Sequence, residues 1–249
     1  MLAVAEADVR KLRHDPWELL TRMVQPALWL LIFGQVLART RAIPTGPIGY
    51  MEFVAPGILA QSVLFVAIFY GVSLIWERDL GIVHKYLASP APRGSLVLGR
   101  ALASGIRGIS QAGVVYLLAV LLGVPLRWTP ADVTGAVLMV MLAAAVFSTF
   151  SLIVACIVKT RERFMGIGQV LTMPLFFASN AIYPLSIMPD WLRTTAVYNP
   201  LTYQVDALRR LMIDGASSAL GLATDFAVQL AALVILTGVA TRLYPRIIN

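Results

Sequence analysis

The chain has 249 residues, of which 59% are hydrophobic and only 13% are charged, with a formal net charge of +7. Soluble domains carry about 25% charged residues, so this composition excludes a water-soluble globule and a disordered chain. The single cysteine, Cys156, excludes an intrachain disulfide and a cysteine-based metal site. In a membrane protein the basic excess first indicates topology, so we expect no nucleic-acid partner.

Six runs of the chain are free or almost free of charge, and each predicts a helix that spans a membrane. Such a helix needs about 20 mostly apolar residues. The runs are continuous rather than alternating, which disfavours a β-barrel. We therefore expect an all-α, polytopic membrane protein with one domain over residues 1–249. In chain order the expected spans are Met23–Ala38, Phe53–Trp76, Ala101–Pro125, Val133–Val158, Phe164–Tyr183 and Phe226–Thr241.

The placement of Lys and Arg predicts the orientation of these spans. With a cytoplasmic N-terminus, the inside segments hold thirteen Lys and Arg residues and the outside segments hold six. Because cytoplasmic segments carry the basic excess, both termini are expected in the cytoplasm. Residues 1–22 mix Val4, Leu12 and Trp17 with charged residues, which predicts an amphipathic helix on the cytoplasmic interface. A frayed, charged tail is the alternative.

Two connecting segments are more than simple loops. In the cytoplasmic segment 77–100, apolar residues at helical spacing end at Pro90 and Pro92. This pattern predicts a short amphipathic helix that either packs on a partner protein or rests on the membrane.

The external segment 184–225 is rich in apolar residues but has no helical stretch long enough to cross. Asp190 is a candidate cap of a helix that runs to Val197, and a second amphipathic helix from Leu201 to Leu211 is expected to stop at Gly215. We expect short re-entrant helices here, with an ordinary surface cap as the alternative.

The sequence gives little support for the common kinds of nucleotide-binding or catalytic site. The stretch 94–101 has the glycine spacing of a phosphate loop, but Arg100 and Ala101 stand where Lys and Ser or Thr are required. No nucleotide site is therefore expected in this chain. His14 and His84 lie outside the spans, and no carboxylate lies within one. This distribution disfavours an intramembrane protease and a self-powered carrier.

Arg107 is the one charged residue expected within a span. An intramembrane charge is a functional candidate by default, although a side chain near the cytoplasmic end of its span can also snorkel to the interface. Small residues recur nearby every four positions at Ser104, Gly108 and Ala112. This stripe predicts close packing against another helix.

The motifs of both connecting segments resemble those of type-2 ATP-binding-cassette (ABC) exporter permeases. The strings 77–81 (ERDLG), 87–90 (LASP) and 98–100 (LGR) resemble the loop between the second and third spans of that family. The strings 183–193, 198–203 (YNPLTY) and 206–209 (DALR) resemble its external segment before the last span. The resemblance covers essentially the whole chain and is nearest to the daunorubicin-type drug-resistance subfamily.

This resemblance implies a division of labour in a prokaryotic cell membrane. A separate cytoplasmic ABC ATPase would bind ATP and Mg²⁺, so this chain would bind no cofactor and would not itself be an enzyme. A second permease, identical or different, would complete the assembly. The residues implied in ATPase coupling are Glu77, Arg78, Asp79, Gly81, His84, Lys85 and Leu87. The residues implied in an external gate are Pro184, Pro189, Trp191, Asn199, Pro200 and Tyr203.

The expected function is therefore ATP-driven export of an amphipathic small molecule or a lipid-like substrate. The sequence leaves the substrate open among drugs, lipids and glycans. A membrane scaffold or assembly partner that does not transport is the alternative function.

Overall fold

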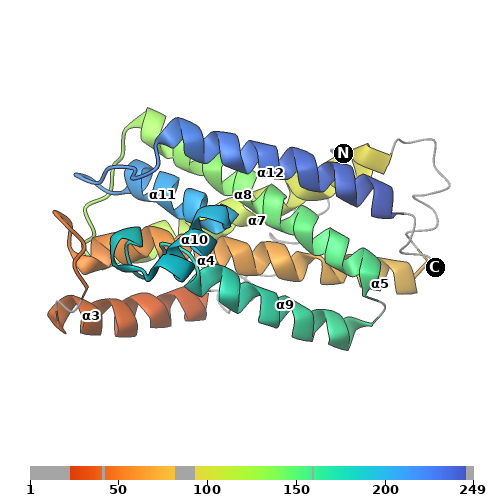
Figure 1. Ribbon diagram of the computed structural model, residues 1–249, viewed down its shortest axis with the longest axis horizontal. Coiled ribbons are helices and arrows are strands. Elements are labelled where there is room, and N and C mark those ends of the chain that lie inside the picture. The colour runs from red at the N-terminus through yellow and green to blue at the C-terminus, as the bar shows by residue number, and fades with distance from the viewer. Residues whose placement is uncertain (1–22, 41–42, 82–92, 159, 245–249) are drawn as a thin grey trace.

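The computed structural model describes residues 23–40, 43–81, 93–158 and 160–244. These residues form a bundle of long helices that lie side by side (Figure 1). In the described part of the chain the one β-type contact is an isolated bridge between Leu126 and Ile213, so the all-α prediction is confirmed there. The elements are η1 (Trp29–Gly34), α3 (Gln35–Thr40), α4 (Tyr50–Tyr70), α5 (Val72–Asp79), α7 (Arg93–Leu121), α8 (Pro130–Ile157), α9 (Arg161–Phe177), η2 (Leu185–Ile187), α10 (Asp190–Tyr198), α11 (Pro200–Met212) and α12 (Leu222–Leu243).

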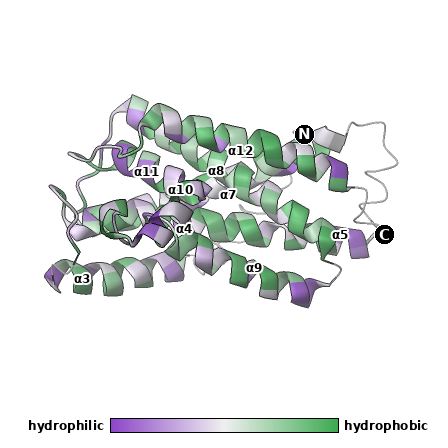
Figure 2. Ribbon diagram, in the orientation of Figure 1, coloured by the Kyte–Doolittle hydropathy of each residue, from purple (hydrophilic) through white to green (hydrophobic). Residues whose placement is uncertain are grey.

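Within the described residues, four helical segments are long and apolar enough to cross a membrane. They are Tyr50–Asp79, Gly94–Leu121, Pro130–Ile157 and Leu222–Leu243, which correspond to the second, third, fourth and sixth predicted spans. Hydrophobic residues dominate along α4, α8 and α12, whereas hydrophilic residues mark the tip of α5 and the start of α9 (Figure 2). Residues 23–40 and 161–177 are also helical, but the count of six spans stays a prediction.

The connection after the second span is shorter than the sequence predicts. Glu77, Arg78 and Asp79 form the last turn of α5, and α7 already begins at Arg93. Hydropathy marks where the apolar residues end, whereas a helix can continue past them with charged residues. The amphipathic helix expected within residues 1–22 lies outside the described residues, as do His84, Lys85 and Leu87.

The interior consists of two separate apolar clusters. The larger cluster joins α4, α7, α8 and α11. The smaller cluster lies at the end of α8 next to α5 (right in Figure 1), and we call this end of the bundle the α5 end. We call the opposite end of the bundle the α11 end. The buried members of the smaller cluster are Leu74, Ile75, Val97, Leu152, Ala155, Cys156, Phe164, Ala240 and Tyr244.

Gly71 separates α4 from α5 between these two clusters. A Cβ atom at this position would collide with the Ser151 hydroxyl of α8 and would lie 2.9 Å from the Phe164 ring. The Ser151 hydroxyl donates a hydrogen bond to the carbonyl of Ile68, in the last turn of α4. Glycine is therefore required sterically where α8 and α9 close on the second span.

The two short helices expected after the fifth span are confirmed as α10 and α11. α11 is almost wholly buried between α4, α8 and α12. Two details of the prediction are wrong. Pro189, not Asp190, precedes the first turn of α10, without a side-chain cap. α11 ends at Met212 rather than at Gly215, because Ile213 turns away and pairs with Leu126.

The packing expected of the small-residue stripe in the third span is confirmed. A Cβ at Gly108 would lie 3.2 Å from side-chain carbons of Val140 and Ala144 on α8. The Ser104 hydroxyl donates to the Ala144 carbonyl at 3.3 Å. Because small side chains let two backbones approach closely, α7 and α8 form a tight pair.

Candidate functional site

Charged side chains from α5 and α7 meet at the α5 end of the bundle. Arg100 of α7 donates to the carboxylate of Glu77 on α5 and forms an ion pair with it. Arg100 is only 8% exposed, so loss of its partner would leave a nearly buried cation. Glu77 precedes residues 82–92 and Arg100 follows them. This pair therefore joins the two helices that flank the connection.

Asp79 holds a second, more exposed group of charges at the same end. Its carboxylate accepts from Arg78 at 2.9 Å and from Arg161, the first residue of α9, at 2.8 and 3.1 Å. The Arg161 guanidinium also lies 3.7 Å from the ring centroid of Trp76 on α5. A carboxylate and an aromatic face thus hold one guanidinium and attach α9 to α5.

The structure describes four of the seven residues implied in ATPase coupling. Glu77 and Asp79 face partners on α7 and α9, and Arg78 pairs with Asp79. Gly81 has a φ of +72°, a left-handed conformation typical of glycine just after a helix. Together these residues fix how the chain leaves α5 toward residue 82.

Asn199 lies at the start of α11 and connects three segments. Its side-chain oxygen accepts from the Leu201 backbone N–H at 3.0 Å and caps α11. Its side-chain nitrogen donates to the carbonyls of Leu175 and Ala178, at 2.7 and 2.9 Å. These carbonyls belong to the end of α9, where helices leave acceptors unpaired. One amide therefore joins the end of α9 to the start of α11.

Pro200 and Tyr203 support the same junction. Pro200 is the first residue of α11, and its carbonyl accepts from Gln229 of α12 at 2.7 Å. The Tyr203 hydroxyl donates to the Val197 carbonyl at 2.8 Å, which ties α11 to the end of α10. The predicted gate residues Asn199, Pro200 and Tyr203 are thus brought together.

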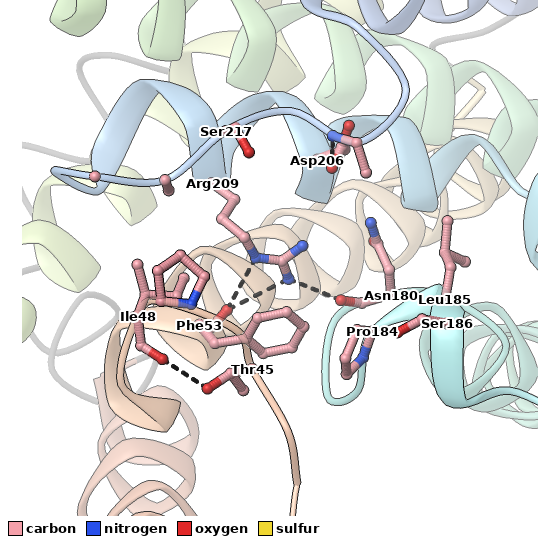
Figure 3. Close-up of a pocket in the computed structure, with 14 residues that line it drawn as sticks. Thr45, Ile48, Phe53, Asn180, Pro184, Leu185, Ser186, Asp206, Arg209 and Ser217 are labelled. Atoms are coloured by element: carbon pink, nitrogen blue, oxygen red, sulfur yellow. Dashed lines mark hydrogen bonds between the residues drawn. The ribbon is translucent and has the colours of Figure 1, made fainter.

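Arg209 of α11 borders an adjacent cavity of about 220 Å³ (Figure 3). Its guanidinium donates to the carbonyl of Phe53 at 3.3 Å and to that of Asn180 at 2.8 Å, and it lies 3.8 Å from the Phe53 ring centroid. Burial lowers the pKa of Arg209 to about 10, against the opposing effect of the Asp206 carboxylate. The side chain thus remains a cation near neutral pH.

Glycine allows the chain after α9 to approach α4 beside Arg209. A Cβ at Gly57 would collide with the backbone of Ala181, lying 2.9 Å from its carbonyl carbon. The Tyr50 hydroxyl donates to the neighbouring Ile182 carbonyl at 3.2 Å. These contacts hold residues 180–182 against the first half of α4.

The remaining predicted gate residues lie at the periphery. Pro184 borders the cavity beside Arg209, and Pro189 precedes α10. Trp191 of α10 is 71% exposed, so it makes little contact with the rest of this chain. An exposed Trp at the end of a membrane helix bundle is typical of the bilayer interface.

Arg107 lies farther from the start of its helix than the sequence predicts. It is fourteen residues after Arg93, where α7 begins, which is about 21 Å at 1.5 Å per residue. Its guanidinium lies 4.9 Å from the ring centroid of Tyr70 on α4. Contact between helices therefore explains its placement better than snorkelling to the helix end.

Sequence reasoning missed three arginines that organise these groups: Arg100, Arg161 and Arg209. Arg100 and Arg209 belong to strings that were matched to the family, LGR and DALR, which was the available signal. Arg161 belongs to a basic cluster that indicated only topology. Its acidic partner is 82 residues away in the chain, a distance that local patterns do not bridge.

A comparison with protein families identifies the group to which these features belong. The model for ABC-2 type transporters matches residues 1–213. The chain is a member of the ABC-2 type transporter family. This permease is therefore a multi-pass membrane protein of a family whose members are ABC transporter membrane subunits, as the motif resemblance predicts.

Curated relatives are similar over most of the permease. It is 29% identical to "Putative transport permease ycf38" of Cyanophora paradoxa, over 81% of this chain and 70% of the relative. It is 24% identical to "Daunorubicin resistance ABC transporter permease protein DrrB1" of Streptomyces coeruleorubidus, over 80% and 70%. It is 27% identical to "Nodulation protein J" of Bradyrhizobium diazoefficiens, over 68% and 65%.

Proposed function

We propose that this permease is the membrane-spanning subunit of an ATP-driven exporter, with ATP bound and hydrolysed by a separate ABC ATPase. The observation that carries the proposal is the family match over residues 1–213. The permease would have six spans and both termini in the cytoplasm of a prokaryotic cell. The excess of Lys and Arg in the segments assigned to the inside, thirteen against six, supports this orientation.

The α5 end is the proposed docking side for the ATPase. Residues 77–89 would enter a groove on the ATPase, with Glu77 and Asp79 at the base of the docked segment. The Glu77–Arg100 and Asp79–Arg161 pairs connect this base to α7 and α9. A displacement of the docked segment would therefore move the ends of three helices together, because packed elements shift as units.

The proposed substrate is an amphipathic small molecule or a lipid-like molecule. The daunorubicin-resistance relative supports a drug-like class, by its name alone. An apolar cavity of about 280 Å³ between α8, α9 and α12 supports the same class, because its whole lining is apolar. Its lining residues are Val146, Phe147, Phe150, Leu175, Pro200, Ala232, Ile235 and Leu236.

α10 and α11 are the proposed external gate. They extend from the middle of the bundle toward the end away from α5, and Asn199 and Arg209 attach α11 to the end of α9 and to α4. In an assembly of two permeases, a shift of these helices would open a route to the outside.

Copurification tests the partnership directly. We expect the tagged permease, extracted from its native membrane in mild detergent, to carry a stoichiometric ABC ATPase. Drugs or lipids that are substrates should stimulate ATP hydrolysis by the complex, and transport in vesicles should require ATP. A complex without an ATPase would instead favour the scaffold function, and transport driven by an ion gradient alone would overturn the proposal.

Substitution of Glu77 tests the coupling site within that complex. We expect Glu77→Ala to reduce substrate-stimulated ATP hydrolysis and transport between about 5-fold and 150-fold, the usual range of coupling between sites. Glu162→Ala is the matched control, because Glu162 is an exposed carboxylate at the same end. The exchange Glu77→Arg with Arg100→Glu should restore part of the loss. Unchanged stimulation and transport in Glu77→Ala would remove Glu77 from the coupling site.

A further inference from the structure

α9 packs on the bundle along a single narrow stripe. Its buried residues are Phe164, Gly168, Thr172 and Phe176, which are spaced four apart. Most of its other residues are exposed, among them Val170 at 70%, although Leu175 also packs against the larger cluster. A helix of 17 residues is about 26 Å long, so α9 reaches from the α5 end to the middle part of α8, where its Leu175 borders a cavity together with Phe147 and Phe150.

The middle of this stripe offers little resistance to movement along the helix axis. At Gly168 a Cβ would meet Ile68 and Phe69 of α4 only at ordinary contact distances of 3.5 and 3.6 Å. The Thr172 hydroxyl donates to the Gly168 carbonyl of its own helix. Apolar contacts without directional bonds permit small sliding movements of one helix along another.

The polar attachments of α9 in the described residues are gathered at its two ends. At the α5 end, Arg161 donates twice to Asp79 and stacks on Trp76. At its other end, the Leu175 and Ala178 carbonyls accept from the Asn199 amide, which also caps α11. Each end is thus bonded to a different candidate functional region.

The contact between Arg161 and Asp79 at the α5 end is poorly explained by a contribution to the stability of the fold. The side chains of Arg161 and Asp79 are 36% and 37% exposed, and exposed ion pairs contribute little to stability. Two donors on one carboxylate and a stacked ring nevertheless fix the direction of the guanidinium. The contact therefore determines position more than it determines folding.

We infer that Arg161 and Asn199 are positioning residues that make α9 transmit displacement of the α5 end to α11. Arg161 acts through Asp79, and Asn199 acts through the last carbonyls of α9. This inference rests on the proposed function, since it assigns the route by which an ATPase-driven movement would reach the external helices.

Distance measurements between two spin labels test this route in the purified complex with its ATPase. The labels replace Thr194 of α10 and Ala131 of α8, which are both exposed, in a Cys156→Ala background. We expect the distance distribution to shift between the nucleotide-free and the ATP-trapped complex. Arg161→Ala should abolish the shift, and the exchange Asp79→Arg with Arg161→Asp should restore it.

Arg163→Ala is the matched control, because it removes the same charge from an exposed position two residues later. We expect Arg163→Ala to keep the shift and Asn199→Ala to lose it. A shift that persists in Arg161→Ala, or a wild-type complex that hydrolyses ATP without any shift, overturns the inference. Absence of an ATPase from the purified complex would instead overturn the proposed function.

Discussion

A buried arginine such as Arg209 is stable only where acceptors compensate for the water that it loses. Arg209 is 6% exposed, and its donors reach two carbonyls from different parts of the chain, those of Phe53 and Asn180. The flat guanidinium also stacks on the Phe53 ring. A planar group with several donors can do both at once, which a lysine ammonium cannot.

The change Arg209→Lys is therefore expected to destabilise the permease by about 1–3 kcal/mol, the cost of a buried polar group left without a partner. Thermal unfolding of the purified protein in detergent measures this loss. The control is Arg210→Lys, at a half-exposed position with a longer, 3.8 Å contact to Asp132. We expect the control to change stability by no more than about 0.5 kcal/mol. Equal losses in both variants would contradict the role assigned to Arg209.

At the residue scale, the sequence predicts the role of a side chain better when its partner lies in the same segment than when its partner lies far away in the chain. Asn199 and Pro200 stand at a helix start, where residue type alone indicates a cap and a first-turn proline. Arg161 and Arg209 have partners 82 and 156 residues away. Only the packed bundle brings these groups together, so no local pattern identifies their distant partners.

At the element scale, the second span, Tyr50–Asp79, is interrupted at Gly71, which divides it into α4 and α5. The break at Gly71 lies between the larger apolar cluster, around α4, and the smaller one, around α5. α5 carries Glu77 and Asp79, which are bonded to α7 and α9. The interruption therefore lies between the part of the span that packs against α8 and α11 and the part that is bonded to α7 and α9.

We expect Gly71→Ala to destabilise the permease by about 1–3 kcal/mol, the usual cost of overpacking a core. The new methyl group would collide with the Ser151 hydroxyl, so the same change should cost less in a Ser151→Ala background. A double-mutant cycle on unfolding midpoints measures this coupling. Gly105→Ala is the control, because its Cβ would meet Met141 at an ordinary 3.6 Å. Strict additivity of Gly71→Ala and Ser151→Ala would contradict a direct collision.

Hydropathy predicts the elements better than it predicts their ends. The apolar runs identify the helices because the hydrocarbon core excludes charge. However, α5 continues through Asp79 and α7 begins at Arg93, whereas the runs end at Trp76 and begin at Ala101. A helix ends where its backbone bonds stop, and these charged turns extend beyond the apolar stretch. The break at Gly71 is invisible to hydropathy, because the residues on both sides of it are apolar.

At the scale of the whole molecule, the proposed orientation places every charged group discussed at the α5 end in the cytoplasm. This orientation and the count of six spans both require that α9 crosses the membrane. Glu162 lies in its first turn, and Ser186 follows it in η2. If α9 crosses the membrane, these two residues lie on opposite sides. With 17 residues, α9 is at the short end of the range for a spanning helix.

Labelling of single cysteines in intact cells separates the possibilities. Glu162 and Ser186 are both exposed, and the one native cysteine, Cys156, is buried and can be changed to Ala. A maleimide that cannot cross the membrane should label Ser186→Cys in intact cells and Glu162→Cys only after permeabilisation. The reverse pattern would invert the topology. If both positions react in intact cells, or if neither does, α9 does not cross the membrane. In that case Arg161 and Asn199, and with them the coupling site and the gate, lie on the same side of the membrane.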